Sequence, residues 1–231
     1  MESVWSQVTA VLFDLDGVIT PTADIHQRAW LQAFSEFAAD ETDYHNYIDG
    51  RPRLDGVRGF LHGRSLTLPE GSPGDAPSTS SVYGIAALKN SIFLQILEHE
   101  PFSGYPGSLA VLSALEERQT PFALVTSSKN AEPVLRASGL RDRFSIIVDG
   151  NRAEEESLRG KPSPDTYLRA ASLLGVAPAD CAIVEDAVSG VMAGRAGGFG
   201  TVIGIDRGAG RDALVAAGAD LVVNDLQETL P

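Results

Sequence analysis

Short runs of apolar and β-branched residues recur along most of the chain, and they alternate with longer segments whose apolar positions have helical spacing. The strand-type runs span residues 8–13, 121–126, 144–148, 181–184, 201–205 and 220–223. The helical segments that follow the later runs span residues 108–118, 131–138, 164–174, 188–196 and 211–217. Strands that alternate with helices build right-handed βαβ units, in which helices cover both faces of a parallel sheet. We therefore predict an α/β fold with a Rossmann-like parallel sheet core.

One long interval, residues 21–102, interrupts this alternation and contains no convincing strand. Three segments in it have apolar residues at helical spacing, namely 23–38, 53–62 and 83–98. Because the interval directly follows the first strand, we predict an inserted α-helical cap domain, with residues 1–20 and 103–231 forming the catalytic core. Residues 68–81 of the cap are rich in Pro, Gly and Ser, which predicts an exposed loop.

The charge of the chain restricts its partners. Asp and Glu number 31 against 18 Lys and Arg, which gives a formal net charge of −13 and a pI of about 4.6. Such a charge argues against nucleic acid or an anionic membrane surface as a partner. An anionic substrate would therefore need a site that is positive locally.

Cysteine content and hydropathy indicate the compartment in which the protein works. The single cysteine, Cys181, excludes an internal disulfide, and it lies in an apolar run that favours a small buried side chain over a reactive thiol. No segment has the length and apolarity of a membrane span, and the N-terminus lacks a signal-peptide pattern. We expect a soluble, cytoplasmic protein that is a monomer or a weak homodimer.

The first predicted strand ends on two carboxylates, Asp14 and Asp16, followed by Gly17. Negative charge gathered at the end of a buried strand is costly unless a positive group offsets it. A bound cation, with one carboxylate left for chemistry, explains the pattern. The alternative is an Asx-type turn that closes an ordinary strand.

The second predicted strand ends in a hydroxyl-rich turn, Thr126-Ser127-Ser128, which leads into a helix. Hydroxyl groups and the free backbone N–H groups at a helix N-terminus suit a phosphate oxyanion. The alternative is an ordinary Ser/Thr N-cap. We take the three hydroxyl residues as candidate phosphate-binding residues.

Two further strand ends carry charged residues. Lys161 lies between a glycine and a proline before a helix, where it could hold a phosphate and a nearby carboxylate or be a plain surface lysine. Glu185 and Asp186 end the fourth strand, and Asp186 could instead cap the following helix. Because ligands of parallel sheets bind beyond the carboxyl ends of the strands, these groups should meet at one edge. All-oxygen carboxylate ligation favours Mg²⁺ bound with a substrate phosphate, which indicates phosphoryl transfer.

These four motifs, in this order, resemble the haloacid dehalogenase superfamily of phosphotransferases over essentially the whole chain. The resemblance implies that Asp14 is the nucleophile that forms an aspartyl phosphate and that Asp16 is the general acid/base. It implies that Thr126 and Lys161 stabilise the transferring phosphoryl group. It further implies Mg²⁺ as cofactor, held by Asp14, the backbone carbonyl of Asp16 and Asp186, with Glu185 in or next to that shell.

Within the superfamily, the segments around Asp14–Trp30, Gly50–Arg53, Lys89-Asn90 and Ser128–Asn130 resemble the β-phosphoglucomutase family. The resemblance implies that His26 helps to position Asp16 and that Arg53 holds the distal phosphate of a sugar phosphate. Lys89 and Asn90 would contact phosphate or sugar hydroxyls. Each of these cap residues could instead be an ordinary helix residue, with His26 partly buried and Arg53, Lys89 and Asn90 at the surface.

The chain departs from the mutase pattern at Asp49, where that family has a lysine, at Pro21, and in a longer loop over residues 66–81. Three hypotheses follow. The first is a mutase that interconverts glucose 1-phosphate and glucose 6-phosphate through a bisphosphate. The second is a phosphatase of small phosphorylated metabolites, and the third is a catalytically silent binding module.

Overall fold

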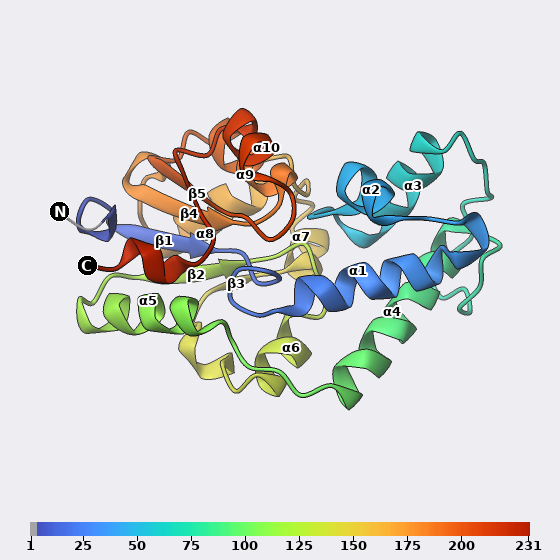
Figure 1. Cartoon of the computed structure of the whole chain (residues 1–231), viewed down its shortest axis with the longest axis horizontal. Coiled ribbons are helices and arrows are strands. Elements are labelled where there is room, and N and C mark those ends of the chain that lie inside the picture. The colour runs from blue at the N-terminus through green and yellow to red at the C-terminus, as the bar shows by residue number, and fades with distance from the viewer. Residues whose placement is uncertain (1–3) are drawn as a thin grey trace. The chain divides into compact units, whose positions relative to one another are not determined.

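The computed structural model describes residues 4–231 (Figure 1). The chain divides into two compact units. The first, the core unit, contains the chain up to Pro21 and again from Phe102 onward. The second, the helical unit, contains Thr22–Pro101. Among residues 4–231, no helix combines the length and the apolarity needed to cross a membrane.

The core unit is built on one six-stranded sheet. Its strands are β1 (Ala10–Phe13), β2 (Phe122–Val125), β3 (Ile147–Val148), β4 (Cys181–Glu185), β5 (Thr201–Ile205) and β6 (Leu221–Val223). They lie in the order β3-β2-β1-β4-β5-β6, and every neighbouring pair is parallel. This topology confirms the predicted α/β fold with a Rossmann-like sheet.

Helices link the strands and lie on both sides of the sheet (Figure 1). They are α5 (Pro106–Glu117), α6 (Ala131–Ala137), α7 (Gly150–Glu155), α8 (Asp165–Leu174), α9 (Val188–Ala196) and α10 (Arg211–Ala217). Short 3-10 turns add η1 (Val4–Ser6), η4 (Arg141–Arg143), η5 (Pro178–Asp180) and η6 (Leu226–Thr229).

The two central strands are buried along their whole length, which agrees with helices on both faces. Alternate residues of β1 face opposite sides, as a strand requires. Leu12 belongs to the core cluster formed with α8, α9 and α10. Phe13 packs on the other side, where its ring centroid lies 6.5 Å from that of Trp5 and 6.2 Å from that of Phe122. Continuous apolar runs thus fill both faces.

The helical unit has its own aromatic core. Its helices are α1 (Thr22–Ala33), α2 (Glu41–Asp43), α3 (Arg53–Gly63) and α4 (Val82–His99), with a 3-10 turn η2 (Ser35–Phe37) and a π-helical turn η3 (Tyr44–Ile48). The ring of Phe34 stacks on Trp30 at 5.5 Å and on Phe60 at 4.0 Å between centroids. This cluster of buried rings holds α1 against α3.

The boundaries of some elements differ from the prediction. The first helix of the insert ends at Ala33, not at residue 38, and the chain continues in the 3-10 turn η2, whose C-cap Ala38 has a left-handed backbone conformation with φ of 50°. Asp40 then accepts a hydrogen bond from the backbone of Asp43 and starts a new helix that periodicity did not indicate.

An additional short helix in the core unit is also absent from the sequence prediction. This helix, α7, includes the first two residues of the acidic run at residues 154–156 and ends at Glu155. Asp149 caps this helix by accepting a hydrogen bond from Arg152 N at 2.9 Å. Glu156 then pairs with Arg152 and Arg169, so the run is part of an ion-pair network.

Candidate active site

The site lies where β1, β2 and β4 end, at the carboxyl-terminal edge of the sheet, along which the strand ends line up. Parallel pairing continues past the strands, because Asp14 N donates to Val184 O at 3.0 Å and Thr126 N donates to Val148 O at 3.0 Å. Both residues are buried, with 6 % of Asp14 and 2 % of Thr126 exposed. The backbone ladder therefore fixes their side chains at the carboxyl end of the sheet, as the strand pattern predicted.

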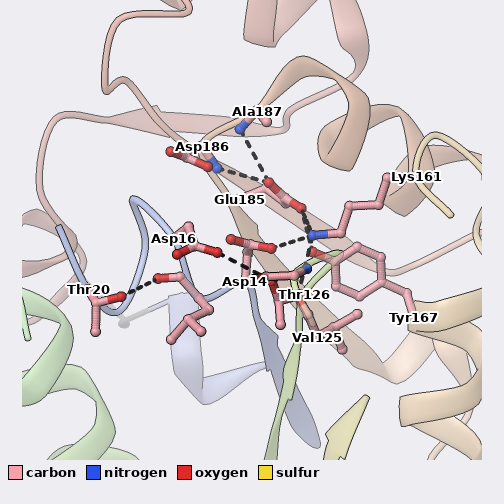
Figure 2. A network of polar contacts seen from close by, with 12 residues as sticks. Asp14, Asp16, Thr20, Val125, Thr126, Lys161, Tyr167, Glu185, Asp186 and Ala187 are labelled. Atoms are coloured by element: carbon pink, nitrogen blue, oxygen red, sulfur yellow. Dashed lines mark hydrogen bonds and ion pairs between the residues drawn. The ribbon is translucent and has the colours of Figure 1, made fainter. Parts of the chain in front are cut away.

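Lys161 occupies the centre of this edge (Figure 2). Its buried ammonium group donates to Asp14 Oδ1 and forms an ion pair with Glu185 Oε1 at 2.5 Å. It also lies 5.1 Å from the centre of the Tyr167 ring. Burial alone would lower the pKa of Lys161, but the two carboxylates outweigh it and raise that pKa above its usual value. The lysine is thus a fixed cation, and the surface-lysine alternative is wrong.

Glu185 accepts hydrogen bonds on both oxygens of its carboxylate (Figure 2). The Tyr167 hydroxyl donates to Oε1 at 2.7 Å, and the backbone N–H groups of Asp186 and Ala187 donate to Oε2 at 3.1 and 3.2 Å. The carboxylate rests against α9 at Gly190, where any Cβ atom would overlap it. Glu185 therefore anchors Lys161 and the start of α9 together.

Asp186 directly precedes the N-cap of α9, which is Ala187 and makes no side-chain cap hydrogen bond. Oxygen atoms of Asp14, Glu185 and Asp186 lie within 4.8 Å of one another. These three residues form the carboxylate cluster of the core unit.

The electrostatics of the cluster suit a divalent cation. Burial raises the pKa of Asp14 well above its usual value, and the charges of Glu185 and Asp16 raise it further, although Lys161 opposes them. One lysine thus leaves an excess of negative charge among buried oxygens. A hard cation with oxygen ligands, such as Mg²⁺, fits this set of donors. The Asp14 carboxylate at the end of β1 accepts a hydrogen bond from Lys161, so its charge is paired with a buried cation.

The hydroxyl turn after β2 lies beside Asp16. Thr126 Oγ1 donates to Asp16 Oδ2 at 3.4 Å and accepts from Ser128 N at 3.1 Å (Figure 2). Ser128 Oγ accepts in turn from Asn130 N at 3.1 Å, and Ser127 lies between the two hydroxyl residues. These bonds shape the turn that precedes α6. The N-cap of α6 is Asn130 and makes no side-chain cap bond, so the Ser/Thr N-cap alternative is wrong.

The other four predicted residues belong to the helical unit. Lys89 of α4 is buried, with its Nζ 2.5 Å from Nδ1 of the half-buried His26 of α1. That Nζ also faces the rings of Trp30 and Phe93, at 5.3 and 4.7 Å from their centres. The structure therefore brings His26 and Lys89 together, and the alternative of a surface lysine at position 89 is wrong, because Lys89 is buried. Asn90 follows on the same helix and is half-buried.

Arg53 is the first residue of α3 and is half-buried. Burial lowers the pKa of its guanidinium group. Within residues 4–231, no carboxylate lies within ion-pair distance of Arg53. Two exposed arginines of the same unit are paired with carboxylates, since Arg28 pairs with Glu100, and Arg58 with Asp55 and Glu70. Arg53 is therefore a partly desolvated cation that the protein leaves unneutralised.

Sequence reasoning missed Tyr167, which the structure places against both Glu185 and Lys161. It lies on α8, and its hydroxyl is held un-ionised because burial raises its pKa well above the usual value. A tyrosine in a helix gives no signal of this contact. Only its position six residues after Lys161 connects it to the motif.

Comparison with known proteins gives the chain close relatives. Residues 8–198 match the family of haloacid dehalogenase-like hydrolases. A β-phosphoglucomutase of Mycobacterium tuberculosis is 44 % identical over 243 residues, covering 97 % of this chain and 92 % of the relative. Hexitol phosphatase A of Escherichia coli is 33 % identical, with 81 % of this chain and 78 % of the relative covered.

Solved structures show the same architecture. The crystal structure of a β-phosphoglucomutase from Clostridium difficile superposes with a TM-score of 0.77 at 25 % sequence identity. The match covers 96 % of this chain and 92 % of that one. Mutases and phosphatases thus both occur among proteins similar to this chain.

Proposed function

Because the chain belongs to the haloacid dehalogenase-like hydrolase family, we propose that it is a Mg²⁺-dependent phosphotransferase of small sugar phosphates, of the β-phosphoglucomutase type. It would interconvert glucose 1-phosphate and glucose 6-phosphate through a bisphosphate. The observation that carries the proposal is the buried Asp14, which belongs to the carboxylate cluster and pairs with Lys161. Phosphorylated sugars and a single buried cysteine are consistent with a cytoplasmic enzyme.

We assign the chemical steps to Asp14 and Asp16. A carboxylate oxygen of Asp14 attacks the phosphorus atom and forms an aspartyl phosphate, while the bond from phosphorus to the sugar oxygen breaks. Asp16 gives its proton to that leaving oxygen. In the second step Asp16 takes a proton from the accepting sugar hydroxyl, whose oxygen attacks phosphorus and releases Asp14.

The transferring phosphoryl group is anionic, and its binding needs positive charge and donors. Lys161 supplies a cation that stays protonated at neutral pH. The hydroxyl groups of Thr126, Ser127 and Ser128 lie in the turn beside Asp16, where they can donate to phosphoryl oxygens. Positioning and electrostatic stabilisation together would supply most of the catalysis.

We assign the Mg²⁺ site to Asp14, Asp186 and the backbone carbonyl of Asp16. Bound Mg²⁺ would neutralise charge on the phosphoryl oxygens and on the carboxylate cluster. Glu185 accepts four hydrogen bonds or ion-pair contacts from Lys161, Tyr167 and two backbone groups. We therefore place Glu185 next to the ligand shell, where it orients Lys161 and Asp186.

The helical unit would select the substrate. Arg53 lacks a carboxylate partner within residues 4–231, so an arriving phosphate would meet an unneutralised guanidinium, the group best suited to bidentate phosphate contacts. We propose that Arg53 binds the phosphate that is not transferred. His26, which contacts Lys89, would help to position Asp16, and Lys89 and Asn90 would contact phosphate or sugar hydroxyls.

The alternative is a phosphatase, in which water takes the phosphoryl group from Asp14. The similarity to hexitol phosphatase A favours this alternative, and so does Asp49, a negative charge four residues before Arg53. A mutase must exclude water from the aspartyl phosphate, whereas a phosphatase must admit it. The two enzymes therefore differ in the fate of one covalent intermediate.

One assay distinguishes them. The protein is incubated with Mg²⁺, β-glucose 1-phosphate and a trace of glucose 1,6-bisphosphate, and glucose 6-phosphate and free phosphate are measured separately. The mutase predicts glucose 6-phosphate in large excess over free phosphate. Free phosphate without glucose 6-phosphate would reject the mutase and support the phosphatase, and activity of Asp14→Asn equal to that of the wild type would reject both.

A further inference from the structure

The turn that follows Asp14 is held by a dense set of backbone hydrogen bonds. Ile19 N and Thr20 N both donate to Leu15 O at 2.9 Å, and Gly17 N donates to Thr20 O at 2.7 Å. Gly17 has a positive φ of 83°, which a side chain would disfavour. Asp16 lies inside this turn, so the direction of its carboxylate depends on how the turn is held against the rest of the core unit.

One cation from a distant segment holds the turn from outside. Arg207 follows β5, and its Nε donates to Gly17 O at 3.1 Å. The same guanidinium group donates to Asn224 O at 3.0 Å and lies 3.7 Å from an Asp225 oxygen. A single side chain thus ties the turn to the segment after β6.

The guanidinium plane of Arg207 also stacks on a ring. Its Cζ lies 3.9 Å from the centre of the Tyr105 ring, and Tyr105 N donates to Ile19 O at 2.9 Å. Tyr105 directly precedes α5, close to where the chain re-enters the core unit at Phe102. Arg207 and Tyr105 therefore hold opposite ends of the same turn, at Gly17 and Ile19.

We propose that Arg207, stacked on Tyr105, is a positioning residue that sets the carboxyl group of Asp16 for proton transfer. The inference rests on the proposed role of Asp16 as general acid/base. An arginine suits this task because its planar fork can donate to two carbonyl groups while its face stacks on a ring, and lysine cannot do all three. Arg207 touches the peptide next to Asp16, and its own contacts are to Gly17, Asn224, Asp225 and Tyr105.

The test compares leaving groups in single-turnover experiments. A sugar oxygen must receive a proton as it leaves, whereas p-nitrophenolate leaves without one. Arg207→Met should slow phosphoryl transfer from β-glucose 1,6-bisphosphate about 10- to 100-fold, because small misplacements of catalytic groups have effects of this size. In the same variant, the rate of p-nitrophenolate release from p-nitrophenyl phosphate should change less than about threefold. The rate of phosphoryl transfer from the bisphosphate in Arg207→Lys should lie between those of wild type and Arg207→Met.

The matched control is Arg211→Met. Arg211 lies four residues further on and donates to Val222 O at 2.7 Å, so it also bonds a carbonyl of the sheet edge without touching the turn. The Arg211→Met variant should accept the phosphoryl group from both donors at the wild-type rate. Tyr105→Leu should instead lose rate selectively on the sugar bisphosphate, as Arg207→Met does. Equal losses on both donors, or no loss on either, would overturn the proposal. A wild-type protein that is inactive on both donors would reject the proposed function instead, before any variant is compared.

Discussion

The core unit and the helical unit each contain a cation withdrawn from water, but they treat its charge in opposite ways. Lys161 of the core unit lies between Asp14 and Glu185, and these carboxylates raise its pKa. Arg53 of the helical unit has no carboxylate within ion-pair distance among residues 4–231, and burial lowers its pKa. One cation is balanced by the fold, and the other has its charge available to a ligand.

This difference separates two tasks in the proposed reaction: phosphoryl transfer, which all substrates share, and recognition of the rest of the substrate, which varies. A buried charge costs free energy unless it is paired, so a protein that leaves one unpaired gains from an anionic ligand. In the proposed function, Lys161 would serve every phosphoryl transfer, because it contacts the proposed nucleophile, Asp14. Arg53 would serve only substrates that carry a second anionic group. Substitutions of these two residues should therefore lower activity on different sets of substrates.

The largest effect should come from Lys161→Met. This change removes the cation beside Asp14, leaves two carboxylates facing each other, and should lower the rate on every phosphoryl donor by at least about a thousandfold. Steady-state rates on β-glucose 1-phosphate and on p-nitrophenyl phosphate measure it. Lys129→Met is the control, because Lys129 pairs with the exposed Glu154 and should be dispensable. Activity of Lys161→Met within tenfold of wild type would contradict a shared role for this lysine.

A smaller and selective effect should follow Arg53→Ala. Mutase turnover should fall about a hundredfold because the distal phosphate loses its partner, whereas hydrolysis of p-nitrophenyl phosphate should change little. Arg58→Ala is the matched control, since Arg58 lies on the same helix and is already paired with Asp55 and Glu70. Equal losses on both substrates would mean that Arg53 is structural, and the contrast between the units would then fail.

Metal binding should stabilise the core unit through its carboxylate cluster. At a free Mg²⁺ concentration about 100 times the Kd, the free energy of unfolding should rise by about 2.7 kcal/mol. Chemical denaturation with Mg²⁺ or with a chelator measures the difference. Asp186→Asn should lose most of this gain, whereas Asp206→Asn should retain it, because Asp206 is a half-buried loop residue outside the cluster whose carboxylate accepts from Gly208 N and Gly210 N. An equal gain in both variants would exclude Asp186 as a ligand.

The smallest effect concerns His45 and Asp49 in the helical unit. Their Nδ1 and Oδ2 atoms lie 3.5 Å apart, and the hydrogen bond to Asp49 raises the pKa of His45 above its ordinary 6.5, although burial opposes it. The pair therefore stabilises the fold fully below pH 6.5, and this contribution disappears as the pH rises through the folded-state pKa. Because both side chains are partly exposed, the contribution should stay below about 0.5 kcal/mol.

Urea unfolding of Asp49→Asn at about two pH units either side of that pKa measures this contribution. The variant should be less stable than wild type on the acidic side and equal to it on the alkaline side. Asp55→Asn, in an ion pair with Arg58 rather than a histidine, should show no such pH dependence. A loss of stability confined to alkaline pH would contradict the sign of the linkage.

The sheet and its charged edge were predictable because both depend on local patterns. An apolar run that stops at Asp14 marks a buried strand, and parallel strands place their carboxyl ends together. The end of the first cap helix at Ala33 was not predictable, because the periodicity does not reveal the 3-10 turn η2 that follows it or the left-handed residue Ala38 that caps this turn. Strand ends and helix ends thus differ in how clearly the sequence marks them.

The contacts between side chains could be predicted only in part. Lys161 and Asp14 were expected at one edge, but the part that Glu185 plays as an anchor depends on Tyr167, Gly190 and two backbone donors. Arg207 and Gly17 are 190 residues apart in sequence, and nothing local to either indicates their bond. Such contacts follow from tertiary packing, which brings together residues with no shared motif.

The central claim is that Asp14 carries the phosphoryl group, and mass spectrometry of the trapped enzyme tests it most directly. The protein is mixed with Mg²⁺ and β-glucose 1,6-bisphosphate, quenched in acid within the first turnover, and digested. We predict that the peptide containing Asp14 gains the mass of one phosphoryl group and that Asp14→Asn gains none. Turnover without this adduct, or a phosphoryl group on another residue in the wild type, would contradict the account.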